Sequence, residues 1–227
     1  MKIKVLANLI MVRLGIRQIL PGDIIRRVKI KEDNDELIRI DEDSNILFDN
    51  RMKAPIYLRK KVYNLLKDFI QEIDKDGYRV KIYDAYRSFE EQKSSWEKRI
   101  KETKKEHPDL SDEEVIHLTS LKVSNIINRE NIGGHQTGGA IDITLVNKNG
   151  QELDMGTKYE EYNEKTFTNS KKITDKQKNN RRYMCEKLEK LGFNNFPAEW
   201  WHYSYGDKMW AAYKRKKVCM YGYIEPK

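Results

Sequence analysis

The stretch GGHQTGGAIDITLV, residues 133–146, places one histidine among four glycines and one aspartate inside an apolar run. The alternation in its second half predicts a strand over 140–146, with the large apolar side chains on one face and Asp142 on the other. The glycines on both sides of His135 let the backbone turn sharply and approach a ligand closely. The stretch therefore predicts that a nitrogen donor and an oxygen donor meet beside one strand.

A third donor lies in the stretch EWWHY, residues 199–203, where His202 follows Glu199 by three positions. Catalytic zinc sites commonly use three histidine or carboxylate ligands and leave one position for water. A nearby carboxylate that is not a ligand then takes the proton of that water. Side chains three apart in an extended strand face opposite sides, so the backbone must twist for Glu199 and His202 to converge.

Hydrophobic periodicity and capping residues predict an α+β fold. Helical spacing indicates helices over 58–73, 88–107, 111–124, 174–193 and 208–217, and alternation indicates strands or extended structure over 37–50, 78–86, 140–146 and 198–206. The second and third helices begin with Ser88 and Ser111, each followed three residues later by a glutamate, which is the capping-box pattern. Gly192 is placed to end the fourth helix. Helices that precede and separate a few strands favour the α+β class.

The composition is that of a globular protein with a heavily solvated surface. Of the 227 residues, 35% are charged and 38% are hydrophobic, and 44 Lys and Arg against 36 Asp and Glu give a formal net charge of +8. No apolar run reaches the roughly 18 residues of a membrane span. Basic and acidic residues are interspersed, which favours a solvated surface over a nucleic-acid-binding one, although the positive charge also suits an anionic cell-wall polymer.

The N-terminus and the cysteines bear on the compartment. The apolar run VLANLIMV, residues 5–12, is at the short limit for a signal peptide and no A-x-A-like site follows it, so a short helix or strand is expected there. Cys185 and Cys219 are the only cysteines and form no CxxC motif, which is typical of a reducing compartment. We expect a cytoplasmic protein, with an exported or wall-associated protein as the alternative.

The motifs together resemble a known family. HQTGGAID and EWWH match the H-x6-D…E-x-x-H signature of the zinc D-alanyl-D-alanine peptidases, which also include the hedgehog amino-terminal domain. IYDAYRS, MGTKYEEY, NNRRYMCEKLEKLGF and EWWHYSYGDKMWA are similar to the D-alanyl-D-alanine dipeptidase branch, over roughly residues 55–222. The resemblance implies a hedgehog-like α+β fold for 51–227, with a small central antiparallel sheet flanked by helices. Residues 1–50 are then an N-terminal extension packed on this core.

The resemblance also implies the metal site. His135, Asp142 and His202 are expected to hold one zinc ion per chain, with water in the fourth position. Glu199 is expected to be the general base that deprotonates this water and later passes the proton to the leaving amine. Ordinary buried histidines and a structural carboxylate are the alternative for the three ligands.

Two further residues are assigned to substrate by the same resemblance. Arg87, in DAYRS, corresponds to the arginine that steadies the scissile carbonyl oxygen, a task suited to a fixed guanidinium. Glu160, in KYEEY, falls where dipeptidases of this branch keep an aspartate for the free ammonium group of the substrate. Gly133 and Gly134 stand where those dipeptidases usually have serines. The alternatives are that Arg87 merely pairs with Asp84, and that Glu160 is a surface residue.

The predicted function is zinc-dependent hydrolysis of D-Ala-D-Ala or a similar short D-peptide. The alternative is a D,D-carboxypeptidase or endopeptidase that acts on peptidoglycan stem peptides, a branch that the sequences RSFEEQ and HQTG resemble. A non-catalytic binding module is a third reading, and the presence of both Glu199 and Arg87 argues against it. No nucleic-acid-binding motif is present, so the expected partner is a small peptide. His107 and His117 are expected at the surface, and the oligomeric state is left open.

Overall fold

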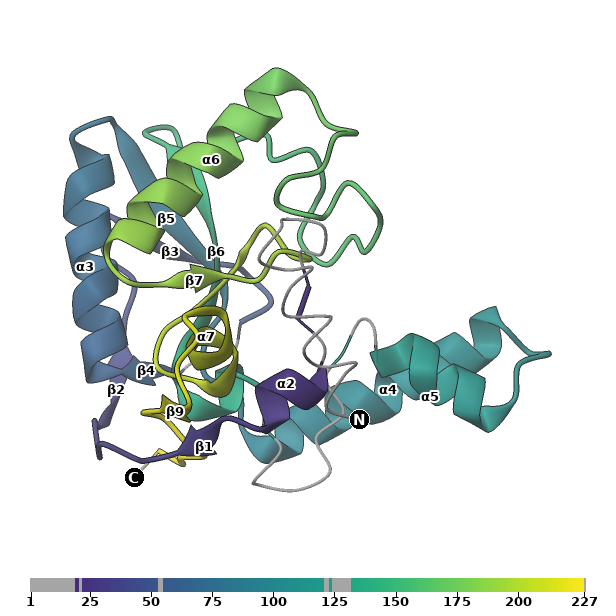
Figure 1. Ribbon diagram of the computed structural model, residues 1–227. Coiled ribbons are helices and arrows are strands. Elements are labelled where there is room, and N and C mark those ends of the chain that lie inside the picture. Colours follow the sequence, from purple (N-terminus) through teal and green to yellow (C-terminus); the bar gives the residue numbers. More distant parts are fainter. Residues whose placement is uncertain (1–18, 21, 53–54, 121–122, 124–131, 227) are drawn as a thin grey trace.

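The computed structural model describes residues 19–20, 22–52, 55–120, 123 and 132–226 (Figure 1). The apolar run at 5–12, for which a short helix or strand is predicted, lies outside the described residues. The strands are β1 Lys29–Ile30, β2 Leu37–Ile40, β3 Ile46–Phe48, β4 Ile56–Arg59, β5 Tyr78–Asp84, β6 Ala140–Asn147, β7 Asn194–Asn195, β8 His202–Ser204 and β9 Val218–Cys219. The helices are α2 Gly22–Arg26, α3 Lys60–Asp74, α4 Phe89–Glu106, α5 Asp112–Ser120, α6 Asp175–Lys190, α7 Lys208–Tyr213 and the 3-10 helix η1 His135–Thr137.

A five-stranded sheet in the order β3-β5-β6-β8-β7 forms the centre of the fold. β6 lies in its middle and pairs antiparallel with both β5 and β8, and β7 pairs antiparallel with β8. At the other edge β3 pairs with β5 in parallel, which the long connection through β4 and α3 permits. The predicted α+β class and small central sheet are confirmed, and the strands that carry the motifs are antiparallel.

Helices α3 and α6 bury their apolar residues against one face of this sheet. α3 contributes Leu66 and Phe69, and α6 contributes Met184 and Leu188, to the same core cluster as the isoleucines and leucine of β6. Because strand side chains alternate between faces, Asp142 points away from these aliphatic side chains of β6. The aliphatic core of α3, α6 and β6 thus lies on one side of the strand, and the face with Asp142 is left for the site.

The described residues before position 50 pair with strands from the rest of the chain. β1 pairs in parallel with β9 near the C-terminus, β2 pairs antiparallel with β4, and β3 extends the central sheet. At the end of β4 the side chain of Arg59 is 1% exposed and forms an ion pair with Glu32 at 2.9 Å. The division into an extension (1–50) and a catalytic domain (51–227) stays a prediction.

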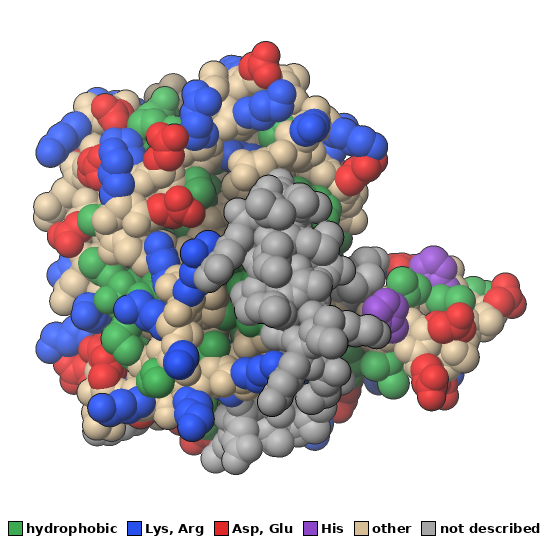
Figure 2. Space-filling model, in the orientation of Figure 1, with side chains coloured by type: hydrophobic (Ala, Val, Ile, Leu, Met, Phe, Trp, Pro, Cys, Tyr) green, Lys and Arg blue, Asp and Glu red, His purple; other side chains and the backbone are tan. Residues whose placement is uncertain are grey.

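Helices α4 and α5 form a hairpin that projects from the core (Figure 1). Ser88 and Glu91 form the predicted capping box at the start of α4, and Ser111 with Glu114 exchange the equivalent hydrogen bonds before α5. The histidine after α4 and the one in α5 are exposed, as predicted, and Figure 2 shows them on this hairpin. Within the described ranges, no helix is both long enough and apolar enough to cross a membrane.

Candidate active site

The sheet register brings two of the predicted metal ligands together. Asp142 of β6 lies directly opposite His202 of β8. His135 begins η1, just before β6, and Gly138 ends this short helix with a φ of 68°. A Cβ at Gly138 would lie 2.5 Å from Leu37 Cδ1, so this position needs glycine for its left-handed φ and for close packing. The tight turn returns the chain into β6 with His135 beside the strand.

The donor atoms of His135, Asp142 and His202 converge. One ligand atom from each residue lies within 4.8 Å of the others. Asp142 Oδ1 is 2.8 Å from His202 Nδ1 and 3.4 Å from His135 Nε2. Donor atoms around tetrahedral zinc lie about 3.3 Å apart, since metal–ligand distances are about 2.0–2.1 Å. The spacing and the two-nitrogen, one-oxygen donor set fit a zinc ion.

The protonation of His135 also fits metal binding. His135 Nδ1 lies 2.6 Å from the carbonyl oxygen of Ala85. A carbonyl can only accept, so Nδ1 carries a proton, and Nε2 is the ring nitrogen that faces Asp142. A histidine that ligates a metal commonly donates its other N–H to a carbonyl in this way.

The electrostatics of the cluster favour a positive charge at its centre. Burial opposes ionisation of His135, but the carboxylate of Asp142 raises the pKa of this ring to about 9. Burial would raise the pKa of Asp142, but the charge of His135 and hydrogen bonds from both histidines lower it. Asp142 is therefore ionised. Its buried negative charge favours a cation between Asp142, His135 and His202.

Glu199 reaches the same centre through a tight turn. The N–H of His202 donates to the carbonyl oxygen of Glu199 at 3.2 Å, which supplies the predicted twist between the two residues. Burial raises the pKa of Glu199 to about 7, and His202, Asp142 and His135 are close enough for their charges to act on it. A carboxyl group with this pKa can both accept and return a proton near neutral pH.

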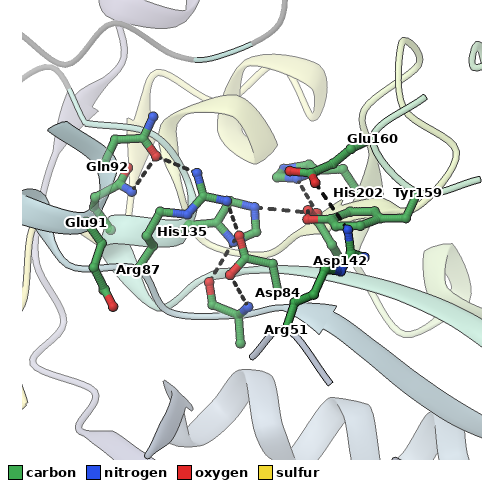
Figure 3. Close-up of polar contacts among 12 residues, drawn as sticks. Arg51, Asp84, Arg87, Glu91, Gln92, His135, Asp142, Tyr159, Glu160 and His202 are labelled. Carbon is green, nitrogen blue, oxygen red and sulfur yellow. Dashed lines mark hydrogen bonds and ion pairs between the residues drawn. The ribbon is translucent and has the colours of Figure 1, made fainter. Parts of the chain in front are cut away.

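Arg87 is held rigidly on the other side of His135 (Figure 3). Its guanidinium pairs with the carboxylate of Asp84 and donates to Gln92 Oε1 at 2.7 Å. Burial lowers the pKa of Arg87, but the negative charge of Asp84 more than offsets this effect and raises the pKa above its ordinary value. The guanidinium is therefore always charged. The pairing with Asp84 is thus present, and it also orients the guanidinium beside the group of His135, Asp142 and His202.

A cavity of about 710 Å³ adjoins the cluster and is lined by Arg87, Tyr159 and Glu160. Glu160 adopts a φ of 61°, which is rare for a residue other than glycine and is often found at functional sites. Its carboxylate lies 3.4 Å from Arg51, and both side chains are about half exposed. Burial raises the pKa of Glu160, while the charge of Arg51 opposes this effect. The structure therefore places both predicted substrate-binding residues in one cavity.

Tyr159 is a site residue to which the sequence assigned no role. Its hydroxyl donates to Asp142 Oδ2 at 2.9 Å, on the oxygen that does not face the histidines (Figure 3). Tyr159 follows Asp142 by 17 residues, beyond the reach of any strand or helix period. Only the folded chain reveals this contact.

Comparison with solved structures finds distant similarities. The chain is 15% identical to VanYB in complex with D-Alanine-D-Alanine, with a TM-score of 0.46 over 74% of this chain and 83% of that chain. It is 20% identical to the LdcB LD-carboxypeptidase, with a TM-score of 0.48 over 87% of this chain and 78% of that chain.

Comparison of sequences identifies the family. The chain is 32% identical to a D-alanyl-D-alanine dipeptidase of Synechocystis over 40% of its length, and 27% identical to that of Escherichia coli over 66%. These alignments span 44% and 67% of the respective relatives, so less than half of the Synechocystis protein is matched. The profile of the D-ala-D-ala dipeptidase family matches residues 49–221, well over half of the chain. The chain therefore belongs to the D-ala-D-ala dipeptidase family.

Proposed function

We propose that this protein is a zinc peptidase that hydrolyses D-Ala-D-Ala or a similar short D-peptide. The observation that carries the proposal is the convergence of the donor atoms of His135, Asp142 and His202 within 4.8 Å, with Glu199 beside them. Membership of the D-ala-D-ala dipeptidase family supports the substrate class. A zinc ion held by these three ligands would supply a Lewis acid that polarises the scissile carbonyl and makes a water molecule more acidic.

The chain's own residues would move the proton. Glu199, with its pKa near 7, accepts a proton from the attacking water as the new C–O bond forms at the carbonyl carbon. It then donates this proton to the amide nitrogen as the C–N bond breaks, so that the second D-alanine leaves as a neutral amine. Each turnover consumes one water molecule and returns Glu199 to its carboxylate form.

Arg87 and Glu160 would hold the substrate. The guanidinium of Arg87 is fixed by Asp84 and Gln92, so it can face negative charge on the carbonyl oxygen without reorganisation. Glu160 lines the same cavity and would bind the free ammonium group of a dipeptide. Its left-handed φ of 61° supports a functional role for this position.

A second candidate is a D,D-carboxypeptidase or endopeptidase that acts on longer stem peptides. One observation favours it: Arg51 already pairs with Glu160. An ammonium group must compete with Arg51 for this carboxylate, whereas a substrate with a blocked amino end need not. The two candidates share the metal site and differ only at the amino end of the substrate.

D-alanine release from two substrates tests both candidates. Zinc-loaded protein is incubated with free D-Ala-D-Ala and with a stem peptide that ends in the same pair, and Glu199→Ala serves as the control. Cleavage of the dipeptide alone supports the dipeptidase, and release from the stem peptide supports the second candidate. Activity on neither substrate, with one zinc bound per chain, would refute the proposed substrates and leave the metal site standing.

The compartment also stays a proposal. In the structure Cys185 is a partly buried thiol and Cys219 is a buried thiol, and neither forms a disulfide. Free thiols are typical of reducing compartments, which supports a cytoplasmic site of action on a small soluble substrate. A wall-associated protein would instead be expected to act on the stem peptide.

A further inference from the structure

We propose that Tyr159 is a positioning residue for the metal site, because it fixes the orientation of the Asp142 carboxylate. This inference rests on the proposed zinc site. The two oxygens of Asp142 have separate partners: Oδ1 faces His202 Nδ1 at 2.8 Å and His135 Nε2 at 3.4 Å, and Oδ2 accepts the Tyr159 hydroxyl at 2.9 Å. A carboxylate held in this way offers one oxygen, not both, to the metal.

The ring of Tyr159 is clamped on three sides, so its hydroxyl has a fixed place. It stacks on Tyr83, with ring centroids 4.4 Å apart and an angle of 11° between the planes. Trp201 meets it edge-on at 5.2 Å, and the guanidinium of Arg51 lies 5.0 Å from the ring centroid. Stacked and edge-on aromatic pairs and cation–π contacts each add to the restraint.

The clamp continues one step beyond the aromatic pair. The hydroxyl of Tyr83 donates to Glu152 Oε2 at 2.5 Å, and Glu152 also binds Lys81 at 2.8 Å. Glu152 forms an isolated bridge with Val146, the residue four positions after Asp142 on the same strand. The Tyr83–Tyr159 stack is therefore connected to β6 at both ends: Tyr83 reaches Val146 through Glu152, and Tyr159 contacts Asp142 directly. These two connections fix the position of the Tyr159 hydroxyl relative to Asp142.

Such restraint acts on metal affinity. A free carboxylate rotates about its terminal bond and loses this freedom when it binds a metal, whereas Asp142 has already lost it. Hydrogen-bond partners of metal ligands typically change metal affinity or activity by about 10- to 100-fold when they are removed. Tyr159 also precedes Glu160, so the segment that carries a proposed substrate-binding residue is anchored directly on a metal ligand.

Zinc affinity of Tyr159→Phe, measured by competition with a chromogenic chelator, tests the inference. The variant keeps the ring and its stacking and removes only the hydroxyl. We expect zinc to bind about 10- to 100-fold more weakly. Tyr162→Phe is the matched control, since Tyr162 lies on the same segment and also packs edge-on against Trp201 at 6.0 Å, but donates no hydrogen bond to Asp142. Its affinity should stay within about twofold of the wild type.

A second readout separates positioning from general stability. Cobalt(II) replaces zinc in such sites and its absorption spectrum reports coordination number. Freed of its hydrogen bond, the Asp142 carboxylate can bind through both oxygens, so the cobalt spectrum of Tyr159→Phe should weaken towards that of a higher coordination number. Metal-free thermal unfolding of each variant checks the fold.

The outcomes distinguish this inference from the proposed function. Wild-type zinc affinity and an unchanged cobalt spectrum in Tyr159→Phe would overturn the role of Tyr159 and leave the metal site intact. A wild-type protein that binds neither ion would overturn both. Equally weakened zinc binding in Tyr159→Phe and Tyr162→Phe would also overturn the role of Tyr159. In that case, losing the hydroxyl that donates to Asp142 would affect zinc affinity no more than losing the hydroxyl of Tyr162.

Discussion

Replacing Arg59 with methionine tests how the N-terminal segment is held to the loop that carries His135. The guanidinium of Arg59 is buried at the end of β4, where it lies 4.7 Å from the ring of Tyr221. It donates hydrogen bonds to the carbonyl oxygens of Thr137 (2.7 Å), Asp35 (2.5 Å) and Gly222 (3.2 Å) and to the carboxylate of Glu32 (2.9 and 3.2 Å). Methionine keeps an apolar side chain, so the variant removes chiefly the charge and the donors.

The size of the effect follows from the burial of the partners. Removing one member of a buried, hydrogen-bonded ion pair costs about 3–5 kcal/mol, because the groups left behind remain out of water. Glu32 is 31% exposed and regains part of its hydration, which places the loss at the lower end, about 3 kcal/mol. For chains of about 150–250 residues, 1 kcal/mol corresponds to about 2–4 °C, so Tm should fall by about 6–12 °C.

Thermal unfolding of chelator-treated protein measures this fall without any contribution from bound metal. Lys60→Met is the matched control, because Lys60 is the next residue and pairs with Glu36 of the same N-terminal segment at 2.7 Å. Both of those side chains are exposed, so solvent screens the pair and Tm should not change measurably. An unchanged Tm in Arg59→Met, or an equal fall in Lys60→Met, would refute the reasoning from burial.

Three further predictions concern catalysis, metal and pH. Arg87→Lys keeps the charge but loses the fixed fork, so kcat for D-alanine release should fall about 10²- to 10³-fold with zinc content unchanged; an unaltered kcat would exclude Arg87 from charge stabilisation. Removing zinc that is present at about 1,000 times its Kd should lower the free energy of unfolding by about 4 kcal/mol, measured as a lower Tm after chelation. Equal Tm values with and without chelator would mean that the folded protein does not bind zinc. Burial would raise the pKa of Asp49, but hydrogen bonds from Arg51 and Lys81 hold it below its ordinary value, so Asp49 stabilises the fold above about pH 4 and less as pH falls. The Tm deficit of Asp49→Asn should therefore shrink from about pH 7 to pH 3, and a deficit independent of pH would contradict this origin.

Local features of the structure could be predicted from the sequence, because their causes lie within a few residues. The capping boxes at Ser88 and Ser111 mark the first turns of α4 and α5, and Gly192 follows α6 with a φ of 99°. The convergence of His135 and Asp142 follows from a glycine-rich turn and strand alternation. The predicted ligand in β8, His202, needed the family resemblance, since the sequence between β6 and β8 has no periodicity that would predict how the two strands align.

The contacts that sequence reasoning missed join distant segments. In the sequence, nothing distinguishes Arg59 from an exposed basic residue at the start of a helix. In the structure, its guanidinium donates a hydrogen bond to the carbonyl oxygen of Gly222, which is 163 residues away. The Tyr159 hydroxyl on Asp142 and the Arg51–Glu160 pair, which are separated by 17 and 109 residues, are equally silent in the sequence. Tertiary packing decides all of these, and no local propensity encodes it.

The direct pairing of Asp142 with His202 across β6 and β8 has a consequence for folding. A slip of one residue between these strands would turn one of the two side chains to the opposite face of the sheet. The three donors could then no longer meet, so only chains with the native register would gain binding energy from the metal. Metal binding would thus shift the equilibrium between slipped and native strand registers towards the native register, which is the arrangement that can hold the ion.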